Sequence, residues 1–212
     1  MNKIYDDLYQ HSQYREDVNV SDHQYLLDTS EPALIHAGSY DSALDMLPLL
    51  EKQLGKRQLS YIFISHLGAD ECGGLNLILE KYPSARIICA DHTARELRGF
   101  GIKGSIMIVR PGERLSGDDF TYYIIDYPSE AHLTSGIVVY EEERKIFFSS
   151  DLMMRAGDGG GHVLASTWKE EIRATNTRQI PNNHLLRNLR HDLSAIDPDF
   201  VAVGHGYCLR LK

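Results

Sequence analysis

Histidine and acidic residues recur at the points where apolar runs of this chain end. Six of them share this position and could bind metal: His66, Asp70, Glu71, His132, Asp151 and His205. Imidazole nitrogens and carboxylate oxygens are common ligands of zinc, iron and manganese ions. Because loops at strand ends are where side chains converge on a ligand in layered α/β folds, the pattern predicts a metal pocket.

Each of these residues has a plainer interpretation when it is considered alone. A single histidine at the end of a strand is commonly a structural residue that is satisfied by a hydrogen bond. A single aspartate there commonly forms a turn or caps a helix. The order in which the six residues recur along the chain is therefore what favours a shared metal site.

Short strands mixed with helices are expected to position these residues. The apolar or alternating runs predict strands at 24–27, 33–36, 60–65, 85–89, 105–109, 122–125, 136–140, 145–148 and 200–203. Helical patterns lie at 41–55, 74–82, 91–98, from 167 onward and at 183–196. In the first helix, Leu44, Leu47 and Leu50/Leu54 are expected to lie on one apolar face. The mixture predicts a layered α/β architecture.

Composition and charge narrow the class of protein. A chain of 212 residues with 42% hydrophobic and 25% charged residues predicts a single globular domain over residues 1–212. The formal net charge of -8 argues against nucleic acid as a partner. The sequence contains no signal-peptide run, no membrane-spanning run and no C-x-x-C pair, so we expect a cytoplasmic protein without membrane contact or disulfides.

The order of the candidate ligands resembles the metallo-β-lactamase superfamily over nearly the whole chain. The pattern of that family is His-x-His/Glu-x-Asp-His, followed by a distant histidine, a bridging aspartate and a final histidine. The positions that match it are His66, Asp70, His132, Asp151 and His205. The resemblance implies the αββα four-layer sandwich of that superfamily.

Two positions depart from the family pattern. Gly68 stands where the family has histidine or glutamate, and Glu71 stands where it usually has histidine. The resemblance therefore implies a first metal position made by His66, His132 and Asp151, with one ligand missing. It implies a second metal position made by Asp70, Glu71, His205 and the bridging Asp151.

Within the superfamily, segments 27–42 and 148–152 are most similar to the flavodiiron and oxygen-binding diiron (ODP) branch. That branch implies two metal ions in a homodimeric protein that binds, senses or reduces dioxygen or related small oxidants. The three carboxylates favour iron, with zinc or manganese as alternatives. A zinc-dependent hydrolase of esters, thioesters or phosphoesters stays open, as does a relative that kept the fold and lost the metals.

The short stretch after the last candidate ligand bears on electron supply. The sequence ends at residue 212, soon after His205, so we expect no flavin to be bound by this chain. Turnover would then need a separate electron donor. This expectation favours gas binding or sensing over a self-sufficient reductase.

Several other residues could lie near the pocket. Cys72, Cys208 and His162 are candidates to join the site, with His162 as a replacement for the ligand missing at Gly68. His36 is expected to pack or to hydrogen-bond beside the pocket without binding metal. The glycine cluster 157–161 is interpreted as a mobile loop beside the pocket, and 141–144 as a solvated hairpin turn.

Overall fold

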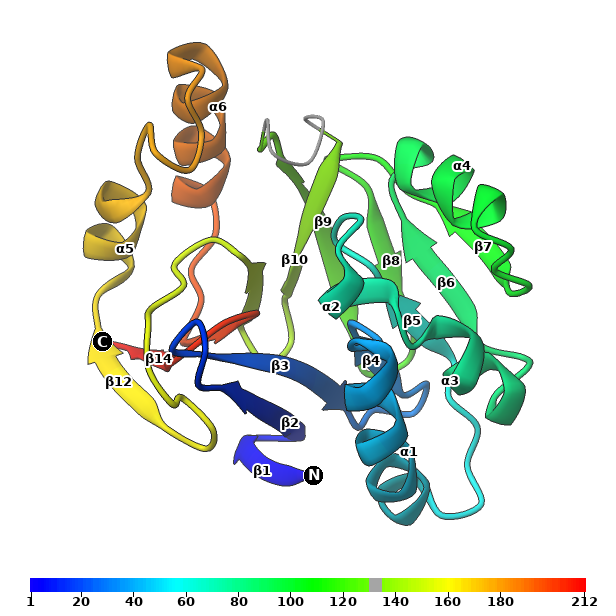
Figure 1. Cartoon of the computed structure of the whole chain (residues 1–212). Coiled ribbons are helices and arrows are strands. Elements are labelled where there is room, and N and C mark those ends of the chain that lie inside the picture. Colours follow the sequence, from blue (N-terminus) through cyan, green and yellow to red (C-terminus); the bar gives the residue numbers. More distant parts are fainter. Residues whose placement is uncertain (130–134) are drawn as a thin grey trace.

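Two β-sheets lie face to face and carry helices on their outer surfaces in the computed structural model of the chain (Figure 1). The structure describes residues 1–129 and 135–212. Each sheet has seven strands within those residues. The layers follow the order helix, sheet, sheet, helix, which confirms the predicted αββα sandwich. None of the helices in the described part of the chain is long and apolar enough to cross a membrane.

The first sheet keeps the order of the chain from edge to edge. Its strands are β1 (Asn2–Tyr5), β2 (Leu8–Arg15), β3 (Val20–Leu27), β4 (Ala33–Ile35), β5 (Tyr61–Phe63), β6 (Arg86–Cys89) and β7 (Ser105–Ile108). Pairing is antiparallel from β1 to β4 and parallel from β4 to β7. The parallel strands are joined through the helices α1 (Tyr40–Leu54), α2 (Ala69–Cys72), α3 (Leu75–Lys81) and α4 (Asp91–Gly99).

The second sheet is formed by the later half of the chain, in the order β12-β14-β13-β11-β10-β9-β8. Its strands are β8 (Arg114–Ser116), β9 (Thr121–Tyr127), β10 (Gly136–Glu141), β11 (Ile146–Ser150), β12 (Val163–Ser166), β13 (Phe200–Val203) and β14 (Cys208–Leu211). Strands β11 and β13 are parallel neighbours. The helices on this side are α5 (Trp168–Ala174) and α6 (Asn183–Ser194).

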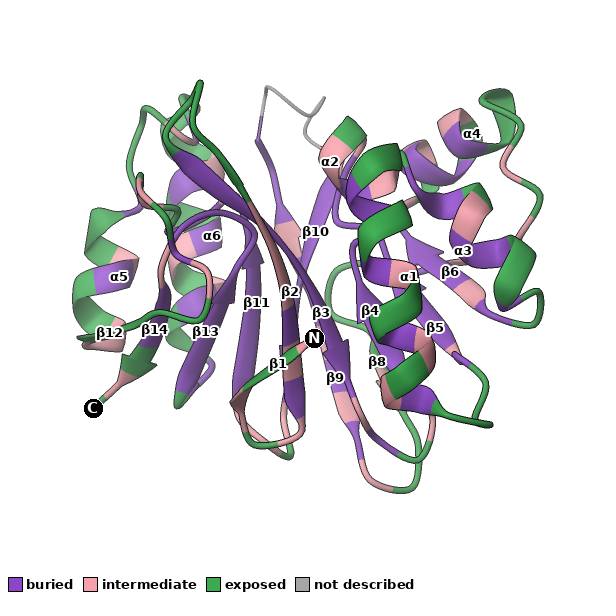
Figure 2. Cartoon of the chain, turned by 60° about the horizontal axis from the view of Figure 1, so that its bottom comes forward, coloured by how far each residue is buried: buried purple, intermediate pink, exposed green. Residues whose placement is uncertain are grey.

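Alternation along the strands divides the apolar side chains between two cores. In β5, Tyr61 and Phe63 belong to the core between the sheets, whereas Ile62 packs in the core beneath the outer helices. In β4, Ile35 faces inward and Leu34 faces outward in the same way. Figure 2 shows the result, with buried strands in the middle and helices whose outer faces are exposed. This is the period of two that a strand imposes on its side chains.

The buried face of α1 agrees with the prediction in part: Leu50 and Leu54 lie in the core, whereas Leu44 and Leu47 differ. Leu44 is 46% exposed, and Leu47 is only partly buried. The helix instead turns a small residue, Ala43, toward the turn before α3, where a Cβ added to Gly74 would meet the Ala43 methyl at 2.2 Å. The close approach of these two backbones sets the rotation of the helix, because a larger residue could not fit there.

The segment 141–144 is a less solvated turn than the sequence suggested. Glu141 is completely buried, and its carboxylate accepts hydrogen bonds from the backbone N–H of Glu143 at 3.3 Å and of Arg144 at 2.7 Å. The Arg144 guanidinium also reaches Asp7 at 3.1 Å. The predicted hairpin turn is present between β10 and β11, but it is only partly solvated because it packs against the turn between β1 and β2.

Candidate metal centre

The predicted ligands lie where strands of both sheets end at one edge of the sandwich. His66 follows β5, Asp151 follows β11 and His205 follows β13. Backbone hydrogen bonds connect the two sheets at this edge, from His23 N–H to the Gly204 carbonyl at 2.9 Å and from Ile137 N–H to the Ser65 carbonyl at 2.9 Å. The site is thus held by backbone on both sides, as expected for the carboxyl ends of neighbouring strands.

His66, Glu71 and Asp151 form a first group of possible ligands. The His66 Nε2 atom lies 3.4 Å from Glu71 Oε2 and 3.5 Å from Asp151 Oδ2. One ligand atom from each of the three residues lies within 4.8 Å of the others. His66 and Glu71 are both buried. Ligand atoms at this mutual spacing could bind one ion between them.

His205 and Asp70 form a second group on the other side of Asp151. The His205 Nε2 atom lies 3.1 Å from Asp151 Oδ1 and 3.5 Å from Asp70 Oδ2. Asp151 therefore turns Oδ2 toward His66 and Oδ1 toward His205. A carboxylate that offers one oxygen to each group is suitably placed to bridge two ions.

Glu71 lies nearer the first group than sequence analysis implied. Its Oε2 atom is 3.4 Å from His66 Nε2, whereas its Oε1 atom is 3.9 Å from His205 Nε2. The side chain starts one helical turn after Gly68, and side chains in a helix tilt toward its N-terminus. The glutamate consequently reaches back over Gly68 toward His66.

The predicted ligand His132 lies in residues 130–134, outside the described residues. The other five predicted ligands are brought together without it, from positions spread between 66 and 205. Its place in the first group stays a prediction.

Asp22 is a site residue that sequence analysis missed. Its Oδ1 atom accepts a hydrogen bond from His205 Nδ1 at 2.9 Å, and Arg15 lies 3.4 Å from its Oδ2 atom. The bond fixes the proton on Nδ1 and directs the Nε2 lone pair toward Asp70 and Asp151. Asp22 contacts the edge of the ring opposite Nε2, so it orients His205. One of its carboxylate oxygens also lies within 4.8 Å of ligand atoms of Asp70 and His205.

A second set of polar residues orients His66. The Ser65 hydroxyl lies 3.0 Å from His66 Nδ1, 2.9 Å from His36 Nε2 and 2.8 Å from the Ser150 hydroxyl. His36 and Ser150 both have positive φ, 64° and 51°. Non-glycine residues with this backbone conformation cluster at functional sites. The predicted role of His36, hydrogen bonding beside the pocket, is confirmed.

Ionisation of the site reflects the crowding of its carboxylates. Burial, reinforced by Asp70 and Asp151, raises the pKa of Glu71 well above its ordinary value. Burial alone would lower the pKa of His205, but its hydrogen bonds to Asp151 and Asp22 outweigh burial and raise the pKa to about 10. Without a cation, protons on these two side chains offset the charge of the acidic residues. Metal ions would displace those protons.

The other candidates lie outside the two ligand groups. His162 is exposed and its ring packs near that of Tyr207, so it does not replace a ligand. The Cys72 thiol contacts the Gly68 carbonyl at 3.0 Å, and the Cys208 thiol lies 3.1 Å from the Tyr25 hydroxyl in the core. Burial is the main cause that raises the pKa of both thiols to about 11. Neither is a ready thiolate ligand.

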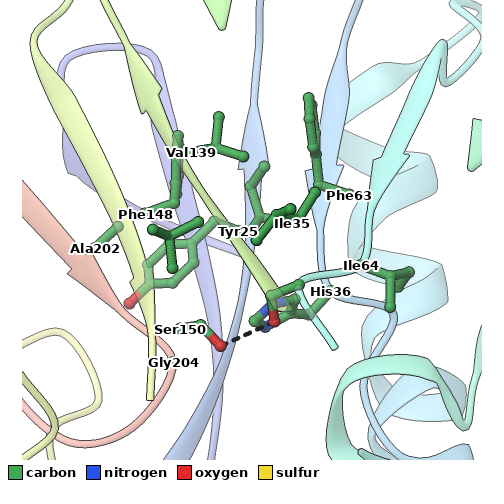
Figure 3. A pocket seen from close by; sticks show the side chains of 13 residues that line it. Tyr25, Ile35, His36, Phe63, Ile64, Val139, Phe148, Ser150, Ala202 and Gly204 are labelled. Atoms are coloured by element: carbon green, nitrogen blue, oxygen red, sulfur yellow. Dashed lines mark hydrogen bonds between the residues drawn. The ribbon is translucent and has the colours of Figure 1, made fainter. Parts of the chain in front are cut away.

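Two spaces adjoin the centre. An open cleft of about 380 Å³ exposes the second group to solvent, with Val18, Met154 and Ala156 on its rim. A small cavity of about 10 Å³ lies between the sheets, and His36, Ser65 and Ser150 are among the residues that line it. Figure 3 shows its apolar walls, which include Phe63 and Phe148.

The glycine cluster 157–161 directly follows Ala156 of the cleft, and hydrogen bonds tie it to the body of the protein. Gly159 N–H donates to the Ser21 hydroxyl at 3.0 Å, and Gly161 N–H donates to Gln10 Oε1 at 2.8 Å. A Cβ on Gly159 would lie 1.9 Å from the Gly206 carbonyl oxygen. Glycine is required here because two backbones meet next to His205.

The residues present fit a pair of metal ions. Within the described residues, Glu71 Oε2 is buried, points at His66 and has no hydrogen-bond partner. A buried carboxylate oxygen left without a partner is costly unless a cation binds it. Three carboxylates and two imidazoles converge, and each imidazole is oriented through Nδ1 by a further residue, as is usual for histidine ligands of metals.

The fold is a metallo-β-lactamase sandwich, and two adjoining groups of possible metal ligands lie at one edge of it. Residues 20–206 match the profile of the family described as ODP family beta lactamase. The chain belongs to that family.

Known relatives agree with this assignment. The putative diflavin flavoprotein A 2 of Thermosynechococcus vestitus is 23% identical over 181 residues, which are 79% of this chain and 31% of that protein. The metal-soaked Flv1 flavodiiron core from Synechocystis sp. PCC6803 superposes with a TM-score of 0.78 at 19% identity, covering 96% of this chain and 54% of that one. Rubredoxin oxygen:oxidoreductase from Desulfovibrio gigas superposes with a TM-score of 0.72 at 16% identity. The similarity covers 99% of this chain and 57% of that one.

These relatives are longer than the region of similarity. The chain spans about a third of the curated relative and a little over half of each of the two solved structures. The similarity therefore concerns the core that carries the candidate metal centre.

Proposed function

We propose that this chain is a diiron protein that binds, senses or reduces dioxygen or a related small oxidant. The observation that carries the proposal is the convergence of three carboxylates and two imidazoles, with Asp151 turned toward both groups. Oxygen-rich ligand sets with some imidazole favour iron or manganese over zinc. The names of the relatives, a flavodiiron core and an oxygen:oxidoreductase, agree with this choice of metal and substrate.

Different residues of the site would bind the ions, give access to them and orient the ligands. His66, Glu71, Asp151, Asp70 and His205, together with His132, would hold the ions. Two irons would supply electron transfer and open coordination positions for the oxidant. The cleft beside His205 gives a small molecule access from solvent. Asp22 and Ser65 would keep the two imidazoles in the orientation that binding needs.

Partners and assembly also belong to the proposal. A reductase activity would require electrons from a separate donor, and the printed names of the relatives, a rubredoxin-linked oxidoreductase and a diflavin flavoprotein, support a redox protein or flavin module in that role. Residues 1–212 would act as one metal-binding domain, because both sheets contribute to the same core and to the same site. A homodimer stays a prediction from the resemblance.

Metal content and gas response test the function together. The chain is produced in iron-replete medium and purified without oxygen, and its iron, manganese and zinc are measured. We expect close to two irons per chain and an absorption change when dioxygen or nitric oxide is added. Asp151→Asn should lose most of the iron, whereas Asp41→Asn, at an exposed helix position, should retain it.

Two results would contradict the proposal. Zinc in place of iron, with no spectral response to either gas, would favour the hydrolase alternative. Less than about one metal per chain under all conditions would favour a relative that keeps the fold without the metals.

A further inference from the structure

The carboxylate of Glu71 occupies the space where a side chain at position 68 would begin. A Cβ built on Gly68 would lie 1.8 Å from Glu71 Oε2 and 3.0 Å from Glu71 Cδ. Residue 71 is three positions after Gly68, so both stand on the same side of the first turn of α2. The two positions therefore compete for one volume beside His66.

We infer that Glu71 supplies to the first metal position the carboxylate that its family pattern places at residue 68, so that a ligand has been exchanged between two positions of one helical turn. This inference rests on the proposed dinuclear function. Within the described residues the first group then has His66, Glu71 and Asp151. The departure at Gly68 is not a lost ligand, because the glycine makes room for the glutamate.

The exchange leaves the second metal position short of a ligand. Position 71, which usually provides an imidazole there, now points to the other ion. Within the described residues the second group has only Asp70, His205 and the shared Asp151, and it faces the open cleft. Asp22 lies beside this group, but its Oδ1 atom is bonded to His205 Nδ1, and Arg15 lies 3.4 Å from its Oδ2 atom.

The two positions should consequently differ in affinity. Two of the described ligands of the first position, His66 and Glu71, are buried, whereas the second position opens to the cleft. We expect the second ion to bind at least about tenfold more weakly, since losing even an outer-shell partner costs about 10- to 100-fold in metal affinity. The metal position beside His66 would then fill before the metal position beside His205.

Titration of the metal-free chain tests the order directly. Fe²⁺ is added without oxygen in a calorimeter, and Zn²⁺, as a diamagnetic probe, is followed by the imidazole NMR signals of His66 and His205. The wild-type chain should show two unequal steps, with the His66 signals changing in the first. Glu71→Gln, which keeps the shape of the side chain, should weaken the first step at least about tenfold. Glu80→Gln, at an exposed site, should change neither step.

A double substitution tests the exchange itself. Glu71→His alone should weaken the first step, and Gly68→Glu alone should force two carboxyl groups into one space. Gly68→Glu combined with Glu71→His should restore the family arrangement and bring the two affinities to within about threefold of each other.

The outcomes separate the exchange from the function on which it rests. A wild-type chain that binds neither Fe²⁺ nor Zn²⁺ would overturn the dinuclear site, and the exchange with it. Two bound ions whose affinities are unchanged in Glu71→Gln would overturn the exchange alone. The exchange would also be overturned if the double variant bound the first ion no more tightly than Glu71→His does. This comparison requires that the circular dichroism and melting temperature of the double variant show a folded chain. If it does not fold, the result for Glu71→Gln decides.

Discussion

His205 Nδ1 lies 2.9 Å from Asp22 Oδ1, although 183 residues separate the two along the chain. Asp22 belongs to β3 of the first sheet, and His205 follows β13 of the second. The contact joins the two sheets at the edge where the candidate ligands meet. It also leaves Nε2 of the ring directed at Asp70 and Asp151.

Removing the charge of Asp22 should weaken metal binding without removing a ligand. Asp22→Asn takes the anionic acceptor from His205 Nδ1, and loss of such a partner typically costs about 10- to 100-fold in affinity. Calorimetric titration with Fe²⁺ measures the change. Asp17→Asn, on the exposed turn before β3, is the control. Equal affinity in Asp22→Asn and the wild type would show that this contact does not support the site.

Ser65 should matter for stability even without metal. Ser65→Ala removes the hydroxyl group that His36, His66 and Ser150 share as a hydrogen-bond partner. The buried polar atoms of these residues then lose that hydrogen bond. We expect a loss of about 1–3 kcal/mol in the free energy of unfolding, measured by urea denaturation of the metal-free chain. Ser84→Ala, at an exposed position, should stay within about 0.5 kcal/mol. If Ser65→Ala also lost no more than about 0.5 kcal/mol, water would have replaced the hydroxyl group.

Acidification should destabilise the fold through His36. Burial lowers the pKa of His36 from 6.5 to about 3, so the folded chain keeps this ring neutral while the unfolded chain protonates it below 6.5. Its contribution to stability therefore falls as the pH drops from 6.5 toward 3, by up to about 1.4 kcal/mol per pH unit.

A variant without the titrating ring isolates this contribution. Asparagine tolerates the positive φ of residue 36 and does not titrate. The unfolding free energy of His36→Asn should therefore depend less steeply on pH between 4 and 6 than that of the wild type. Parallel curves for the two proteins would assign the acid sensitivity to other groups.

The glycine cluster offers a test of backbone packing beside His205. A methyl group at residue 159 would collide with the Gly206 carbonyl, so Gly159→Ala should cost about 2 kcal/mol or more in the unfolding free energy. Gly99→Ala meets no atom within 4 Å at the end of α4 and should be neutral or stabilising by up to about 1 kcal/mol. Equal melting temperatures for the two variants would contradict the close approach.

Much of the fold could be predicted because its central strands are continuously apolar. The predicted run 200–203 is β13, and 145–148 lies largely within β11. The strands that were not predicted lie toward the edges of the sheets. Strand β2 contains polar residues such as Gln10 and Gln13, which carry no alternating pattern. Pairing with β3, which is buried along its whole length, is what makes β2 a strand.

The candidate site was predictable to the extent that its residues follow strand ends. Asp22 was missed because it lies inside a strand, where an acidic residue forms no motif with His205 until the sheets are packed together. The nearness of Glu71 to His66 was not foreseen, because spacing shows where a side chain starts and not where its carboxylate ends. Only the empty volume at Gly68 draws it toward His66.

Anomalous diffraction at the iron absorption edge, from crystals of the chain loaded with Fe²⁺ without oxygen, tests the central claim most directly. The account predicts two iron peaks bridged by Asp151, with one about 2.0–2.2 Å from ligand atoms of His66 and Glu71 and the other at the same distance from Asp70 and His205. No peak at these residues, or Glu71 bound to the ion beside His205, would contradict it.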